Sequence, residues 1–154
     1  MPAILFVCTA NICRSPMASG LFKAMLDEAQ IPGEWQIESA GTWALEGESA
    51  ATGSQTVMSE RAINISKHRA QNVSRELLLI FDLILTMESG HKESLRVEFP
   101  DLSDRIFLLS EMVNQLNEIE DPYGGTLSEY EQAADEIEGY LKNGFDEIIH
   151  MATL

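Results

Sequence analysis

The sequence has only two cysteines, Cys8 and Cys13, among 154 residues. Two cysteines so close together cannot cross-link a fold, which excludes a disulfide-stabilised scaffold and favours the reducing cytoplasm. No apolar run is long enough to cross a bilayer, and the first residues lack the charged segment of a signal peptide. We therefore expect a cytoplasmic protein without membrane insertion.

Basic residues are scarce as well. Ten Lys and Arg stand against 25 Asp and Glu, which gives a formal net charge of −15. Such a charge repels phosphate backbones, so no nucleic-acid partner is expected. The chain is 45% hydrophobic and 23% charged, and it contains no internal repeat or linker. These values predict one globular domain over residues 1–154.

The first sixteen residues combine three structural signals. Ile4–Val7 is an apolar run rich in β-formers, which predicts a strand buried on both faces. Ser15 and Pro16 are typical of a helix start, with Ser15 expected as the N-cap. Between them, Asn11 is the non-glycine residue type best suited to a left-handed turn conformation. Cys8 is therefore expected at the end of a strand, and a short loop leads from it to a helix N-terminus.

This arrangement has a chemical meaning. A loop before a helix N-terminus can direct several backbone N–H groups at one anion, and the helix dipole adds positive potential. Arg14 can donate two hydrogen bonds to the same anion, a geometry that suits phosphate. A cysteine in such a field favours the nucleophilic thiolate, and Ser15 can donate to its sulfur. The interpretation is a phosphate site with Cys8 as nucleophile; the alternative is that Cys8 is a small buried apolar residue and Arg14 a surface charge.

Strands and helices alternate along the rest of the chain. Further strands are expected at 35–40, 82–86 and 105–109, and helices at 57–62, 74–81, 89–99 and 128–149. Ser128 and Glu131 match a capping box at the start of the last helix. This order predicts an α/β three-layer sandwich: a four-stranded parallel sheet, helices on both faces, and the phosphate loop after the first strand.

A second chemical element precedes the last helix. Asp121 lies in an acidic segment, followed by Pro122 and by Gly124-Gly125, which permits a sharp turn. Displacement of an alkoxide or phenoxide by a thiolate requires an acid that protonates the departing oxygen. Asp121 is the candidate for this acid, and an acidic surface loop is the alternative.

The run from Val7 to Ala18 resembles the signature of the low-molecular-weight protein tyrosine phosphatases. The similarity continues through Ser39-Ala-Gly-Thr, Phe81-Asp-Leu-Ile-Leu and Asp121-Pro-Tyr-Gly-Gly, over nearly the whole chain. The resemblance implies hydrolysis of phosphotyrosine through a phosphocysteine, with no metal or cofactor. It also implies a phosphorylated protein as partner, such as a tyrosine kinase or its targets.

The resemblance also implies roles for individual residues. Cys8, Arg14 and Asp121 would be catalytic, Ser39 would brace the phosphate loop, and His68 would hydrogen-bond Asn11. Tyr123 would stack beside the substrate ring, whereas Trp43 would either form a pocket wall or fold over the edge of the core. Cys13 would either form a reversible disulfide with Cys8 or be a packed thiol. The phosphate-binding loop would comprise Thr9, Ala10, Asn11, Ile12, Cys13, Arg14 and Ser15, with Ala10 where the family often has glycine.

Two other functions remain open. Thr9, the Asp121 run and Asp135-Glu-Ile-Glu also resemble the bacterial protein arginine phosphatases of the same fold. That branch typically has threonine where this chain has Ile12, whose methyl groups suit an aromatic ring, so Ile12 favours phosphotyrosine. A non-catalytic phosphate-binding or regulatory module would need neither Cys8 nor Asp121. Thioredoxin-linked arsenate reductases are disfavoured, because they use two further cysteines.

Overall fold

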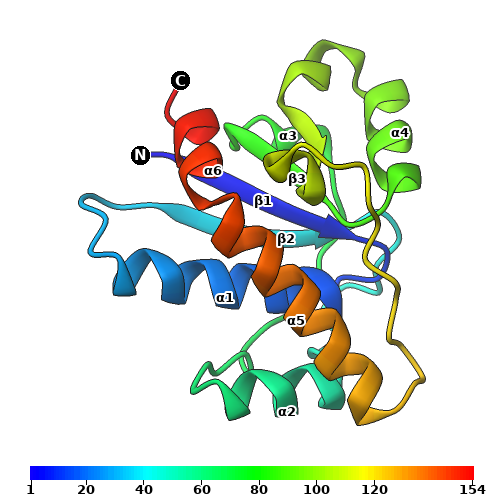
Figure 1. Ribbon diagram of the computed structural model, residues 1–154. Coiled ribbons are helices and arrows are strands. Elements are labelled where there is room, and N and C mark those ends of the chain that lie inside the picture. Colours follow the sequence, from blue (N-terminus) through cyan, green and yellow to red (C-terminus); the bar gives the residue numbers. More distant parts are fainter.

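The computed structural model describes residues 1–154 and contains one four-stranded parallel sheet (Figure 1). Its strands are β1 (Ala3–Cys8), β2 (Gln36–Gly41), β3 (Leu83–Thr86) and β4 (Ile106–Leu108), in the order β2-β1-β3-β4. All four strands were expected from the sequence, and all neighbours pair in parallel. Because β1 has a partner on each side, its carboxyl end and Cys8 lie at the middle of one sheet edge.

Helices cover both faces of this sheet, which confirms the predicted three-layer sandwich. The six residues of β1 are all buried, and successive side chains enter opposite clusters. Ile4 and Phe6 pack with the larger cluster, beneath α1 (Arg14–Glu28), α2 (Thr52–Glu60), α5 (Leu127–Asn143) and α6 (Phe145–Ala152). Leu5 and Val7 pack with the smaller cluster, beneath α3 (Arg75–Leu78) and α4 (Ser89–Glu98). Two 3₁₀ helices, η1 (Pro100–Arg105) and η2 (Leu109–Val113), flank β4.

The helix boundaries differ from the sequence prediction in three places. The helix predicted at 74–81 is shorter, because α3 comprises only Arg75–Leu78. The helix predicted at 57–62 begins earlier, because α2 starts at Thr52. The predicted helix 128–149 is two helices, α5 and α6, separated by Gly144. A Cβ atom at Gly144 would lie 2.8 Å from Cβ of Met112, so the break allows close contact with η2. The N-cap of α5 is Thr126, which accepts from the N–H of Glu129, so the capping box predicted at Ser128 was wrong.

The start of α1 also corrects a prediction. Its N-cap is Cys13, whose side chain makes no capping hydrogen bond, and Arg14 is the first helical residue. Ser15, predicted as the N-cap, lies inside the first turn, where its hydroxyl contacts Cys8 and Asn11. The Ser15 hydroxyl thus forms hydrogen bonds within the loop and does not cap the helix. No helix in the structure combines the length and apolarity that a bilayer crossing requires.

Candidate active site

In the loop between β1 and α1, the backbone carbonyl groups are bonded to the protein and the N–H groups are left free. Its carbonyl oxygens point to the surrounding protein: those of Cys8 and Thr9 accept from the N–H groups of Thr42 and Trp43, at 3.0 and 2.9 Å. The carbonyl of Ile12 accepts from the N–H of Ala51 at 2.8 Å. None of the N–H groups of residues 9–13 donates to another group of the protein. These N–H groups remain available to one anion in front of the loop.

Asn11 holds the loop in this shape. It is fully buried and has a φ of 58°, the left-handed conformation that its residue type tolerates. Its Nδ2 donates to the hydroxyls of Ser15 (2.8 Å) and Ser39 (2.9 Å), and its Oδ1 accepts from the N–H of Gln71 (3.0 Å). Its backbone carbonyl lies 2.6 Å from Nε2 of His68. Ser39 and His68 therefore lie behind the loop and support it through Asn11.

A matched pair of substitutions measures how much this support contributes. Asn11→Ala removes three buried side-chain hydrogen bonds and adds the strain of alanine at positive φ. The free energy of unfolding should therefore fall by about 3 to 4 kcal/mol. Asn114 has a similar φ of 61°, but it is exposed and its side chain makes no hydrogen bond. Asn114→Ala should therefore lower the free energy of unfolding only by the backbone strain, about 1 kcal/mol. Urea unfolding measures both values, and equal losses would contradict a supporting role for the Asn11 side chain.

Cys8 lies at the floor of a cavity of about 370 Å³ in front of the loop. Its Sγ is 3.0 Å from the hydroxyl of Ser15, and the residue is 2% exposed. Loop residues 8–14 other than Asn11 form the floor of the cavity. The walls come from two other segments: Trp43, Leu45 and Glu48 follow β2, whereas Asp121 and Tyr123 precede α5. Trp43 is 81% exposed, so it forms a pocket wall rather than covering the core.

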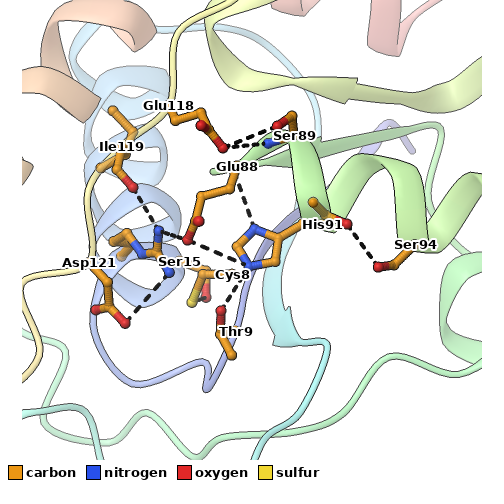
Figure 2. A network of polar contacts seen from close by, with 12 residues as sticks. Cys8, Thr9, Ser15, Glu88, Ser89, His91, Ser94, Glu118, Ile119 and Asp121 are labelled. Carbon is orange, nitrogen blue, oxygen red and sulfur yellow. Dashed lines mark hydrogen bonds and ion pairs between the residues drawn. The ribbon is translucent and has the colours of Figure 1, made fainter.

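Arg14 is the only cation that lines this cavity, and its side chain is 1% exposed. Its Nη1 donates to the carboxylate of Glu88 at 2.5 Å and to the carbonyl of Ile119 at 2.7 Å (Figure 2). Its Nη2 lies 3.7 Å from Oδ2 of Asp121, and its buried Nε has no partner. The Nη1 edge is thus fixed by the protein, while Nε and Nη2 form a two-donor fork suited to an oxyanion.

Asp121 reaches the cavity from the loop before α5. Its side chain is about half exposed, and its Oδ1 accepts from the N–H of Tyr123 at 3.1 Å. This local turn holds Asp121 and Tyr123 together at the mouth of the cavity. The neighbouring Glu118 is turned away, because its carboxylate accepts from the N–H and hydroxyl of Ser89. Asp121 is therefore the carboxylate of this segment that faces Arg14.

Cys13 differs from Cys8 in its surroundings. Burial raises the pKa of Cys13 to about 11, and its thiol contacts the hydroxyl of Tyr130 at 3.7 Å. Both cysteines are free thiols in the structure. A thiol with so high a pKa stays protonated at neutral pH, so Cys13 is a poor nucleophile and Cys8 is the better candidate.

Two residues of the site were missed in the sequence. Glu88 was not among the candidate site residues, yet it forms an ion pair with Arg14. Its position directly after β3 was a usable signal, because ligand sites gather at the carboxyl ends of parallel strands. His91, in the first turn of α4, lies 2.8 Å from the hydroxyl of Thr9 through its Nε2. Nothing in the sequence marked this histidine.

The two histidines that contact the loop predict a pH dependence of stability. Burial lowers the pKa of His68 and of His91 below the ordinary value of 6.5. Below that value the unfolded chain binds protons that the folded chain does not yet accept, so acid favours unfolding. The free energy of unfolding should be constant above about pH 6.5 and fall on acidification toward pH 5. His68→Gln should make this fall shallower in urea titrations, and an unchanged slope would contradict the assignment.

Comparisons with known proteins agree with this geometry. Residues 3–151 match the family described as low molecular weight phosphotyrosine protein phosphatase. The chain is 39% identical to a protein-arginine-phosphatase of Geobacillus stearothermophilus, over 88% of each chain. It is 38% identical to the probable low molecular weight protein-tyrosine-phosphatase EpsP of Ralstonia nicotianae, again over 88% of each chain. A crystal structure of the low molecular weight protein tyrosine phosphatase from T. tengcongensis superposes with a TM-score of 0.89 at 38% identity, covering 96% of this chain and 99% of that one.

The chain therefore belongs to the low-molecular-weight protein tyrosine phosphatase family. Members of this family are phosphatases that act on phosphorylated proteins, and this chain is such a hydrolase. Relatives named as arginine phosphatases are present beside those named as tyrosine phosphatases, which matches the alternative raised by the sequence.

Proposed function

We propose that this chain hydrolyses phosphotyrosine in proteins, with Cys8 as the nucleophile. The observation that supports this most strongly is the convergence of three groups on one cavity. The Cys8 thiol and the Arg14 fork come from the two ends of one loop and the Asp121 carboxylate from a distant segment, and all three line the same 370 Å³ space. A phosphate-binding module would have no use for a nucleophile and an acid in this arrangement, so the enzyme is the better-supported function.

The reaction has two steps. The Cys8 thiolate attacks phosphorus, the bond from phosphorus to the tyrosine oxygen breaks, and Asp121 gives its proton to that oxygen. Water then attacks the phosphocysteine, Asp121 takes a proton from it, and inorganic phosphate leaves with the Cys8 thiolate restored. Throughout, the N–H groups of the loop and the Arg14 fork bind the phosphoryl oxygens. The Ser15 hydroxyl, 3.0 Å from Sγ, stabilises the departing thiolate in the second step.

The walls of the cavity favour an aromatic substrate. Ile12 lies at the floor, and Trp43, Leu45 and Tyr123 stand around the mouth. These side chains present apolar and aromatic surface that suits a phenyl ring. Arginine phosphatase is the second candidate, and the similarity to the Geobacillus relative supports it. Glu48 and Asp121 are the carboxylates of the cavity that a guanidinium group would meet.

Matched peptides that carry phosphotyrosine or phosphoarginine at the same position distinguish the two candidates. We expect a higher kcat/KM for the phosphotyrosine peptide, with no turnover by Cys8→Ser. Ile12→Thr should shift the ratio toward phosphoarginine, because it replaces a methyl-bearing wall with a hydroxyl. A preference of the unmodified chain for phosphoarginine would overturn the first candidate in favour of the second. Phosphate binding without turnover of either peptide would leave a binding module.

Asp121→Asn tests the proposed acid. The amide has the same shape but no proton to give, so kcat on a phosphotyrosine peptide should fall roughly 10²- to 10³-fold. An aryl phosphate whose phenol is much more acidic needs little protonation and should lose far less. Glu120→Gln changes the neighbouring exposed carboxylate and should leave kcat within about twofold. An equal loss on both substrates would contradict the acid role of Asp121.

The partners and location of the enzyme follow from the same reasoning. A phosphorylated protein, such as a tyrosine kinase or one of its targets, is the proposed substrate, because the cavity opens at the surface beside exposed Trp43 and Tyr123. The use of only two cysteines in 154 residues fits a cytoplasmic location, where disulfides are rare. A single domain over residues 1–154 remains a prediction of the composition.

A further inference from the structure

His91 makes two hydrogen bonds that together define its tautomer. A backbone N–H can only donate, and that of Glu88 lies 3.2 Å from Nδ1 of His91. Nδ1 is therefore the acceptor, and in a neutral imidazole the proton then sits on Nε2. Burial and the nearby Arg14 lower the pKa of His91, which keeps the ring neutral. Nε2 lies 2.8 Å from Oγ1 of Thr9, so His91 donates this hydrogen bond and Thr9 accepts it.

The contact with His91 leaves the proton of the Thr9 hydroxyl unused. His91 is the only hydrogen-bond partner of Thr9 Oγ1 in the protein, and it occupies a lone pair rather than the proton. Thr9 follows the nucleophile directly and lines the cavity that contains Cys8, Arg14 and Asp121. The hydroxyl proton is therefore free to be donated to an acceptor in that cavity. Phosphoryl oxygens are the acceptors that the proposed reaction brings there.

The same helix start also holds Arg14. The carboxylate of Glu88 binds Nη1 of Arg14 at 2.5 Å, while the backbone N–H of Glu88 fixes the His91 ring (Figure 2). Two groups that face the cavity, Arg14 and Thr9, are thus both oriented from the first turn of α4. The His91 side chain is only 8% exposed, so water competes little for its contact with Thr9.

We infer that His91 is a positioning residue that fixes the Thr9 hydroxyl as a hydrogen-bond donor to the phosphoryl group bound at Cys8. This inference rests on the proposed function. The Thr9 hydroxyl is thereby added to the groups already described at the site, which are the loop amides, Arg14, Ser15, Cys8 and Asp121. His91 itself touches no reacting atom, because it acts through Thr9.

Four variants test this role. Thr9→Val removes the hydroxyl at nearly constant shape, whereas Thr9→Ser keeps it. His91→Asn keeps an oxygen that can accept from the Glu88 N–H, but its side chain is too short to reach Thr9. The fourth variant combines Thr9→Val with His91→Asn. His150→Asn, at an exposed histidine on α6, is the matched control for a change of residue type.

Two measurements are made on each variant: kcat/KM for an aryl phosphate, and the Kd of inorganic phosphate by calorimetry. Thr9→Val should lower kcat/KM and weaken phosphate binding roughly ten- to a hundredfold, the value of one hydrogen bond to a charged group. Thr9→Ser should stay within about threefold of the unmodified chain. His91→Asn should lose nearly as much as Thr9→Val, and the double variant no more than Thr9→Val alone, because both changes remove the same contact.

Two results would overturn the inference. One is a Thr9→Val variant whose kcat/KM and phosphate Kd stay within twofold of the unmodified chain, and the other is losses that multiply in the double variant. Multiplying losses would mean that His91 acts by another route, such as a general loosening of α4, and unfolding in urea would show that loosening directly. If the unmodified chain bound phosphate but turned over no substrate, the proposed function would fail, and the series of Kd values would still decide the role of His91. Absence of phosphate binding would overturn both.

Discussion

Replacing Cys8 with serine is expected to lower kcat/KM for an aryl phosphate roughly 10⁴-fold or more, because a neutral hydroxyl is a far weaker nucleophile than a thiolate. The serine Oγ would occupy nearly the same place, 3.0 Å from the Ser15 hydroxyl in the present structure. The loop and the Arg14 fork do not depend on the sulfur. The Kd of inorganic phosphate should therefore change little, and steady-state kinetics with calorimetry measure the two effects separately.

Cys13→Ser is the matched control for this result. Cys13 lies in the same loop, but burial raises its pKa to about 11 and its thiol contacts Tyr130. The substitution changes the same chemical group without removing the proposed nucleophile, so kcat/KM should fall at most about tenfold. A Cys13→Ser variant as inactive as Cys8→Ser, with its fold intact, would contradict the assignment of Cys8 as the sole nucleophile.

Arg14→Lys should have the second-largest effect, a loss of kcat/KM on the order of 10³-fold. A lysine keeps the charge but has a single ammonium group in place of the planar fork. In the structure, Nη1 of Arg14 is held by Glu88 and Ile119, while Nε has no partner and Nη2 lies 3.7 Å from Asp121. One ammonium cannot satisfy these partners and also bind two phosphoryl oxygens. The Kd of inorganic phosphate should therefore rise together with the loss of kcat.

Arg61→Lys is the corresponding control. Arg61 also pairs with carboxylates, those of Glu131, Asp135 and Glu138 of α5, but it does not line the cavity. Its replacement should leave kcat/KM within about twofold. If Arg14→Lys changed activity no more than Arg61→Lys, the fork at Arg14 would not be a phosphate-binding group.

Local sequence patterns determined much of this fold. The apolar run before Cys8 and the alternation of strands and helices were enough to predict the parallel sheet, because strand period, helix period and turn residues all agreed. The candidates for nucleophile, cation and acid were also visible, since Cys8, Arg14 and Asp121 each lie in a segment whose local chemistry is unusual. Asn11, with its φ of 58°, was visible for the same reason.

The contacts that Glu88 and His91 make with the loop were not visible in the sequence. Glu88 meets Arg14 across 74 residues, and His91 meets Thr9 across 82. A glutamate followed three residues later by a histidine has no distinctive pattern, so only the pairing of β1 with β3 reveals that α4 begins beside the loop. The break at Gly144 was hidden for a related reason, because the apolar stripe of the last helical segment continues through it. Close approach to Met112 is a tertiary contact.

The most direct test of the mechanism is detection of the phosphoenzyme. The chain is mixed with a phosphotyrosine peptide, denatured rapidly during turnover, cleaved into peptides and examined by mass spectrometry. We predict one phosphate on the peptide that contains Cys8, present during turnover and absent once the substrate is consumed. The same label should be missing from a Cys8→Ala variant. Continued turnover with no phosphate on Cys8, or with the phosphate on another residue, would contradict covalent catalysis by Cys8.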